Sequence, residues 1–147
     1  MTKRKWTSLA VIAATILAAY FINVEVQTYL GKKALRASGL AIHTLGEAKT
    51  LAQRESKLIL ADLSAIWCPT CRTLDRRVLS KETVRKTIEA HYIFARIEYE
   101  SAEGEAFRKH YQLSGFPNLL ILKPSGELVR KLPLTFDPEQ FQKSLMF

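Results

Sequence analysis

Cysteine is almost absent from this sequence of 147 residues: the chain has only two, Cys68 and Cys71, in the stretch DLSAIWCPTC. Histidine and methionine are also scarce, with three and two residues. A structural zinc site needs four ligands, and His43, His91 and His110 lack ligand spacing to one another. No cluster rich in methionine or histidine accompanies the thiols to favour copper(I). We therefore predict neither a metal site nor another cofactor.

The sequence also lacks internal repeats and low-complexity tracts. Its hydrophobic content of 48% and charged content of 24% are typical of a globular protein, and its length suits one domain with a short extension. The net charge is +8, of which +5 falls on residues 1–39. A nucleic-acid-binding protein would concentrate its charge on the folded domain. The pattern argues against nucleic acid as a partner and favours anionic lipid headgroups.

Charge is absent from the 19 residues between Trp6 and Val24, WTSLAVIAATILAAYFINV. A helix of that length, at about 1.5 Å per residue, just spans a bilayer core of roughly 30 Å. A cleaved signal peptide has the same basic start and apolar middle, but no good A-x-A cleavage signal directly follows the run. A buried helix of a soluble domain fits poorly, because the segment has no polar face. We predict residues 1–30 as a membrane anchor or an uncleaved signal.

Basic residues on the two sides of this segment set its expected orientation. The N-terminal side has Lys3, Arg4, Lys5 and the α-amino group, and the far side has three basic residues offset little by Glu25. The balance modestly favours an N-terminus in the cytoplasm. We therefore expect a single-pass protein of the inner membrane with its domain facing the periplasm or outer side, where disulfide chemistry is possible.

Beyond the anchor we predict a short stalk over residues 31–40, with helix breaks at Gly31 and Gly39, and a folded domain over residues 41–147. The expected helices cover residues 44–55, 68–79, 81–90, 102–111 and a closing segment, with N-caps at Thr44, Ser80, Ser101 and Asp137. The expected strands cover residues 57–63, 92–99, 118–123 and 128–132. This alternation predicts an α/β fold with a parallel sheet core covered on both faces and an antiparallel hairpin at its edge.

The cysteine pair directly follows one of these apolar strands. A disulfide that closes so small a ring constrains little chain entropy, so it is a weak structural staple. At a helix start, in contrast, unpaired N–H groups and the helix dipole stabilise a thiolate at Cys68. Pro69 suits the first helical turn, and Cys71, one turn on, can attack a mixed disulfide formed by Cys68. Redox chemistry is therefore the favoured interpretation.

The stretch DLSAIWCPTC, followed later by SGFPNLLIL, resembles the thioredoxin family over about residues 41–147. WCPTC resembles the family's W-C-x-x-C active-site motif, Asp62 matches its buried acid, and Phe116-Pro117 matches its cis-proline loop. The surroundings of the cysteines are closest in style to the C-terminal domain of DsbD-type transmembrane reductases. The resemblance implies a thioredoxin-like fold, in which a central mixed sheet is flanked by helices.

Two departures limit what the resemblance implies. Pro69 and Thr70 stand where cytosolic thioredoxin has Gly-Pro, so the redox poise of that protein cannot be transferred. With one predicted span, the chain cannot itself carry electrons across a membrane. The dipeptide also lacks the histidine that stabilises the reduced thiolate in oxidising relatives, which favours a reductant.

Chemistry and resemblance together assign roles to the residues of the site. Cys68, expected to be the more exposed, is the nucleophile, and Cys71 is the resolving thiol. Asp62 is costly to bury unless it is paired or protonated, which makes it a candidate proton acceptor for Cys71. The alternative for Asp62 is an acid exposed at a strand end. Arg96 either aligns with the family's lysine near that acid or is a solvated strand residue.

Five residues are candidates for substrate binding: Trp67, Pro69, Thr70, Phe116 and Pro117. Trp67 either shields the sulfurs or is a core aromatic, and Pro117, if cis, presents a strand-like edge to the partner's cysteine segment. We expect protein disulfides as substrates and an electron donor of the DsbD type in the membrane or periplasm. The alternatives are a non-catalytic thioredoxin-like binding module and a copper(I)-handling assembly factor at the membrane.

Overall fold

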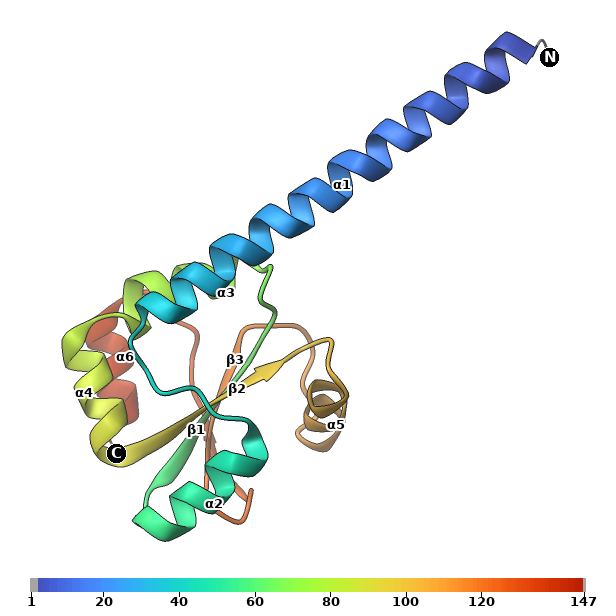
Figure 1. Cartoon of the computed structure of the whole chain (residues 1–147). Helices are drawn as coiled ribbons and strands as arrows, with labels where there is room; N and C mark the ends of the chain where they lie inside the picture. The colour runs from blue at the N-terminus through green and yellow to red at the C-terminus, as the bar shows by residue number, and fades with distance from the viewer. Residues whose placement is uncertain (1–2, 147) are drawn as a thin grey trace.

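The computed structural model describes residues 3–146 and has a four-stranded sheet flanked by helices (Figure 1). The strands are β1 (Leu58–Ser64), β2 (Tyr92–Glu98), β3 (Asn118–Leu122) and β4 (Leu128–Lys131), in the spatial order β2-β1-β3-β4. β1 is parallel to β2 and antiparallel to β3, which in turn is antiparallel to β4. The mixed sheet flanked by helices is therefore confirmed, whereas the predicted parallel core is limited to one pair of strands.

The parallel core is limited because β3 starts at the end of the sheet where β2 finishes. Leu63, near the end of β1, pairs with Ile97 of β2 and with Asn118, the first residue of β3. The intervening helix α5 (Ala102–His110) thus does not carry the chain back to the opposite end of the sheet. β3 consequently runs back along β1 in the antiparallel direction.

The remaining helices of the domain are α2 (Leu45–Glu55), α3 (Pro69–Leu74), the π-helix η1 (Asp75–Leu79), α4 (Glu82–His91) and α6 (Pro138–Leu145). Three predicted N-caps are confirmed, because their side chains accept hydrogen bonds from the first turn of a helix: Thr44, Ser101 and Asp137. The cap predicted at Ser80 is wrong. Lys81 precedes α4, and the Ser80 hydroxyl donates to the Arg76 carbonyl over 2.6 Å. The π-helix η1 continues directly from α3, and Ser80 is the C-cap residue of η1.

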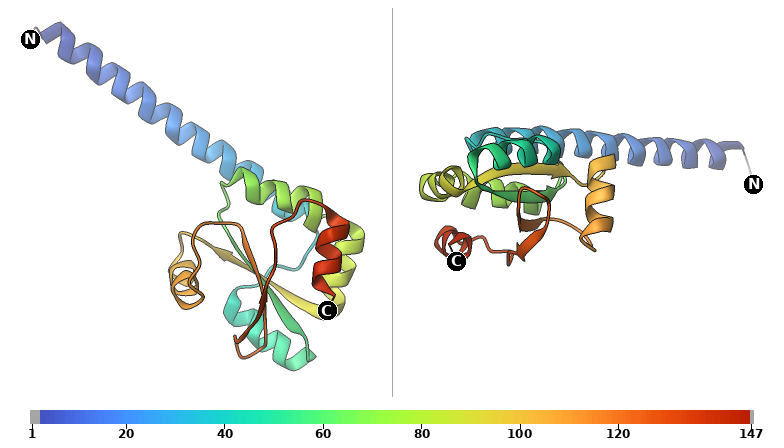
Figure 2. Two further views of the ribbon diagram at one scale, coloured as in Figure 1. Left: turned by 180° about the vertical axis from the view of Figure 1, so that it is seen from behind. Right: turned by 90° about the horizontal axis from the view of Figure 1, so that it is seen from below.

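Alternation along β1 divides its side chains between the two faces of the sheet, which helices cover (Figure 2 shows the layers). Ile59 and Leu63 pack in an apolar cluster with α2 and α5. Leu60 packs in a second cluster with α3, η1, α4 and α6. Asp62 and Ser64 follow Leu60 at intervals of two residues and lie on the same face, so the strand directs two polar side chains toward the layer that contains the cysteines.

Helix α1 (Lys3–Ala37) projects from the domain as a single rod (Figures 1 and 2). Its stretch Ser8–Ala37 is long and apolar enough to cross a membrane, a property that signal sequences share. The side chains of Lys3, Arg4 and Lys5, on which the predicted orientation rests, lie outside the described part of the structure.

The helix break predicted at Gly31 is wrong, whereas the break at Gly39 is confirmed. Gly31 lies inside α1 and is buried against Ile66, where an added Cβ would stand 1.8 Å from the Ile66 carbonyl oxygen. Gly39 has a φ of 72°, a conformation that glycine adopts readily and that ends the helix. Residues 31–37 are therefore helical and packed on the domain.

Candidate active site

Cys68 is the N-cap of α3, which follows β1 through a short loop at residues 65–67. Its backbone is extended, with φ −75° and ψ 121°, and Pro69 occupies the first helical turn, as predicted. The backbone N–H of Cys71 donates to Cys68 Sγ over 3.1 Å. No bond joins the two sulfurs in the structure.

Cys68 is the more exposed of the two, but the difference is small: 4% of the residue against none for Cys71. The neighbouring Pro69 and Thr70 are exposed. The site thus presents Pro69, Thr70 and one edge of Cys68 to solvent, with Cys71 enclosed behind them.

Burial raises the pKa of the Cys71 thiol to about 12, and the contact with the Cys68 sulfur adds to this rise. Polar contacts with the backbone of Ala65 and with the Ser64 side chain lower this pKa and so oppose the rise. A thiol with such a pKa keeps its proton near neutral pH. Cys71 therefore needs a proton acceptor before it can attack a mixed disulfide.

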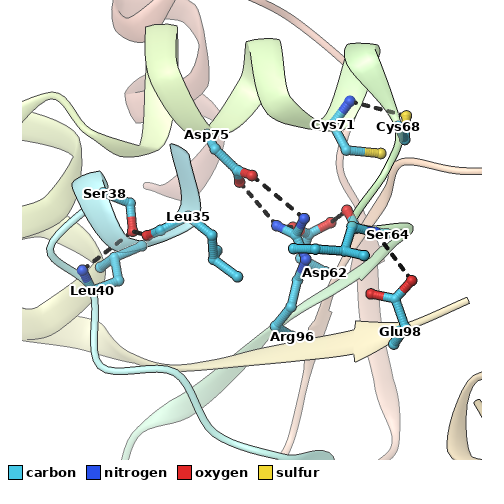
Figure 3. A network of polar contacts seen from close by, with 11 residues as sticks. Leu35, Ser38, Leu40, Asp62, Ser64, Cys68, Cys71, Asp75, Arg96 and Glu98 are labelled. Carbon is cyan, nitrogen blue, oxygen red and sulfur yellow. Dashed lines mark hydrogen bonds and ion pairs between the residues drawn. The ribbon is translucent and has the colours of Figure 1, made fainter. Parts of the chain in front are cut away.

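Asp62 is fully buried and has two close partners (Figure 3). Ser64 Oγ donates to Asp62 Oδ1 over 2.7 Å, and Arg96 Nη1 lies 2.8 Å from Asp62 Oδ2. The alternative of an acid exposed at a strand end is therefore wrong. Because Ser64 contacts both Cys71 and Asp62, its hydroxyl links the thiol to the carboxylate. The sequence analysis missed Ser64, although strand alternation places it on the same face as Asp62.

Arg96 lies between two acids. It pairs with Asp62 in the register of β1 and β2, and its Nη1 also lies 2.9 Å from Asp75 Oδ1. Only 6% of the Arg96 side chain is exposed, so the alternative of a solvated strand residue is wrong. Burial alone would lower the pKa of Arg96, but Asp62 and Asp75 outweigh that effect and raise it.

Asp75 is the acid that the sequence analysis missed. Burial raises its pKa to about 6, Arg96 opposes the rise, and Asp62 adds to it. Asp75 lies four residues after Cys71, a spacing that places two side chains on the same side of a helix. That spacing, together with an arginine on the neighbouring strand, could have indicated Asp75 as a residue of the site.

Three aromatic rings pack around the sulfurs: Trp67, Tyr99 and Phe116. The ring of Phe116 meets Trp67 edge-on at 5.5 Å and Tyr99 at 4.6 Å between centroids. Shielding of the sulfurs by Trp67 stays a prediction, because a core aromatic residue would pack in the same way, and Tyr99 was not predicted. The peptide bond between Phe116 and Pro117 is cis, as the resemblance predicted.

Two glutamates at the end of β2 hold the loop that precedes Cys68. Glu98 Oε1 accepts from the backbone N–H of Ile66 over 3.0 Å, and Glu100 Oε2 accepts from Trp67 Nε1 over 3.2 Å. Burial raises the pKa of Glu98, and the Ile66 N–H opposes that rise. The loop is therefore fixed by side chains from the neighbouring strand as well as by its own backbone.

A Cys-x-x-Cys pair at a helix start, a buried acid on the preceding strand and a cis-proline beside the sulfurs together define a thioredoxin-like domain. The chain belongs to the thioredoxin-like family, whose family model matches residues 41–124.

Two curated relatives illustrate the range of proteins that contain such a domain. UBX domain-containing protein 2 of Schizosaccharomyces pombe is 29% identical over 99 residues, which cover 67% of this chain and 23% of the relative. The thiol:disulfide interchange protein DsbD of Salmonella typhimurium is 26% identical over 133 residues, which cover 85% of this chain and 23% of the relative. The chain thus spans less than a quarter of the length of either relative.

A solved structure of similar fold is the thioredoxin of Thermus thermophilus. It superposes with a TM-score of 0.66 and 26% identity, covering 72% of this chain and 84% of the thioredoxin. The similarity covers most of that small protein, so the domain described above is comparable in extent to a whole thioredoxin.

Proposed function

We propose that this protein is a membrane-anchored thiol–disulfide oxidoreductase that works outside the cytoplasm and reduces protein disulfides. One observation carries the proposal: the enclosed thiol of Cys71 is linked through Ser64 to the buried carboxylate of Asp62. A binding module with incidental cysteines has no use for a proton acceptor behind its second thiol. A dithiol reductant needs one.

The reaction begins when the Cys68 thiolate attacks one sulfur of the substrate disulfide. A bond forms between Cys68 and that sulfur, the substrate S–S bond breaks, and the other substrate sulfur leaves as a thiolate that takes a proton. Cys71 then gives its proton to the Ser64 oxygen while Ser64 passes its own proton to Asp62. The Cys71 thiolate attacks the Cys68 sulfur, the bond between Cys68 and the substrate breaks, and the second substrate sulfur leaves as a thiolate that takes a proton from solvent, while Asp62 returns its proton to solvent. The protein is left with a Cys68–Cys71 disulfide, which an electron donor must reduce again.

The substrate's cysteine segment binds across the exposed rim of the site. Pro69 and Thr70 are exposed beside Cys68, and Trp67 and Phe116 are partly exposed, so all four can contact a partner. Phe116 packs against the cysteine cluster, and we assign to Pro117, which follows it, the strand-like edge that pairs with substrate backbone.

The membrane assignment rests on the apolar segment between Trp6 and Val24, and the orientation rests on the basic residues around it. We assign the chain to the inner membrane with its domain in the periplasm. The similarity to DsbD supports exchange with redox partners that have disulfides and an electron donor of the DsbD type. The absence of histidine between the cysteines supports the direction of reduction.

The reduction potential of the Cys68–Cys71 pair, measured against glutathione in the full-length protein, tests this proposal. We expect a couple more reducing than the about −180 mV of protein disulfide isomerase. A value close to the about −120 mV of DsbA would instead identify an oxidant. A pair that does not exchange with glutathione or with a protein disulfide would support the binding module.

A further inference from the structure

The second half of α1 is a structural part of the active site. Its buried positions Gly31 and Ala34 lie about one turn apart, and Ser38, directly after its end, is buried as well, so one side of the helix faces the domain. At Gly31 the helix backbone touches the carbonyl of Ile66, two residues before Cys68. One turn earlier, Gln27 Oε1 accepts from Arg72 Nη1 of α3. The anchor helix and the active-site helix are therefore joined directly.

The order of these contacts shows which part of the domain lies nearest the apolar segment. Gln27 and Gly31 contact the start of the active-site helix and the loop before it, whereas Gly39 lies beside Arg85 of α4. A chain leaving the apolar segment thus reaches the cysteine-bearing edge first and the opposite end of the domain later (Figure 1).

The distance between the apolar segment and the cysteines follows from the helix rise. Val24 ends the uncharged run, and Gly31 follows seven residues later, about 10 Å further along the helix. The headgroup layer on one side of a bilayer is roughly 5–8 Å thick. Gly31 and the adjoining Cys68 loop therefore stand at the outer surface of the headgroups.

Exposed side chains on α1 suit this position. Tyr29 is 67% exposed and lies between the uncharged run and Gly31, at the depth where interfacial aromatic residues are found. Lys32, Lys33 and Arg36 follow, all exposed, where they can contact anionic headgroups.

We infer that the substrates are disulfides of integral membrane proteins that lie at the bilayer surface. This inference rests on the anchoring and the disulfide exchange proposed above. The Cys68–Cys71 dithiol reduces the partner's disulfide to two thiols and becomes a disulfide itself. A folded soluble protein would have to enter between the cysteine-bearing edge and the lipid, because α1 has no break between Lys3 and Ala37 that would let the domain turn away.

The test uses full-length, pre-reduced protein in vesicles of phosphatidylcholine and phosphatidylglycerol. One transmembrane peptide has a disulfide about 10 Å beyond the hydrocarbon edge, and a second has it on a helical extension of 20 residues, about 30 Å further out. We expect the near disulfide to be reduced at least about tenfold faster, because the helix fixes the effective concentration of Cys68 at that depth. A small soluble peptide disulfide gives the reference rate.

A helical insertion sharpens the test. Seven residues inserted after Glu25 raise the domain by about 10 Å and turn it by only about 20°. Reduction of the near disulfide should fall several-fold, and a peptide raised by the same seven residues should restore it. The matched control has the seven residues between Lys5 and Trp6, where they lengthen the helix without raising the domain, and it should behave as the wild type.

Equal rates for near and distant disulfides, or an insertion that leaves the near rate unchanged, would overturn the inference while leaving the oxidoreductase proposal intact. Failure to reduce the soluble disulfide as well would instead contradict the proposed function. Release of the protein from the vesicles would contradict the anchoring.

Discussion

Cys68 and Cys71 lie one helical turn apart, yet their surroundings differ in almost every respect. Cys68 borders exposed residues and aromatic rings, and its sulfur accepts a backbone N–H. Cys71 is enclosed, and the Ser64 hydroxyl connects it to a buried group of two acids and one arginine. The comparison indicates a division of labour, in which one thiol meets the partner and the other depends on groups within the protein.

The largest expected effect is on trapping of mixed disulfides. Cys71→Ser should trap a stable mixed disulfide through Cys68, because the resolving thiol is gone, whereas Cys68→Ser should trap little. Burial prevents partners from reaching Cys71, and its pKa of about 12 keeps the thiol protonated. Non-reducing electrophoresis with mass spectrometry of the conjugates measures both. Equal trapping by the two variants, or by neither, would refute the division of labour.

Asp62→Asn should slow disulfide exchange about tenfold or more near pH 7, because the proton acceptor for Cys71 is lost. The loss should shrink at higher pH, where Cys71 ionises unaided. The first attack by Cys68 should be unchanged, so the mixed disulfide should accumulate. The matched control is Asp75→Asn, which removes the same charge from Arg96 but leaves the contact between Ser64 and Asp62. Superimposable pH–rate profiles for Asp62→Asn and the wild type would leave Asp62 without a role in proton transfer.

Ser64→Ala should have a smaller effect of the same kind, a slowing of about threefold to tenfold near pH 7. The variant keeps Asp62 and Arg96 but removes the hydroxyl that links Cys71 to the carboxylate. Rapid-quench measurement of the mixed disulfide separates the two attacks, and only the second should slow. A variant that slows the first attack equally would show that Ser64 positions the loop and does not relay the proton.

The smallest expected effect is on stability. Burial raises the pKa of Asp75 from its ordinary value of 3.8 to about 6, so the folded protein binds more protons than the unfolded chain between these values. The contribution of Asp75 to the free energy of unfolding should therefore fall as pH rises from about 4 to 6, by on the order of 2 kcal/mol. Asp75→Asn should remove that slope. Urea unfolding of both proteins between pH 4 and 7 measures it, and parallel curves would contradict the assignment.

Much of this site could be predicted from local patterns in the sequence and from the family resemblance. The cysteine spacing and Pro69 predicted the helix start, and the resemblance predicted the buried Asp62 and the cis bond before Pro117. Three of four N-caps were also predicted, because a cap depends on residues within one turn of the helix.

The missed features depend on contacts between segments far apart in the chain. Arg96 reaches Asp62 only through the parallel register of β1 and β2, so its role could not be chosen from the sequence alone. Gly31 was predicted as a helix break because glycine is a poor helix former. Its position inside α1 is explained by the Ile66 carbonyl, which leaves no room for a Cβ.

The unbroken helix α1 also sets the direction in which the active site faces around the helix axis, relative to the apolar segment. Each residue of an α-helix turns the chain by about 100°. A single residue gained or lost between Val24 and Gln27 would therefore turn the cysteines by about 100° around the axis of α1 relative to the apolar segment, while shifting them along that axis by only about 1.5 Å. The number of residues between the apolar segment and the domain, and not the composition of that segment, therefore sets this direction.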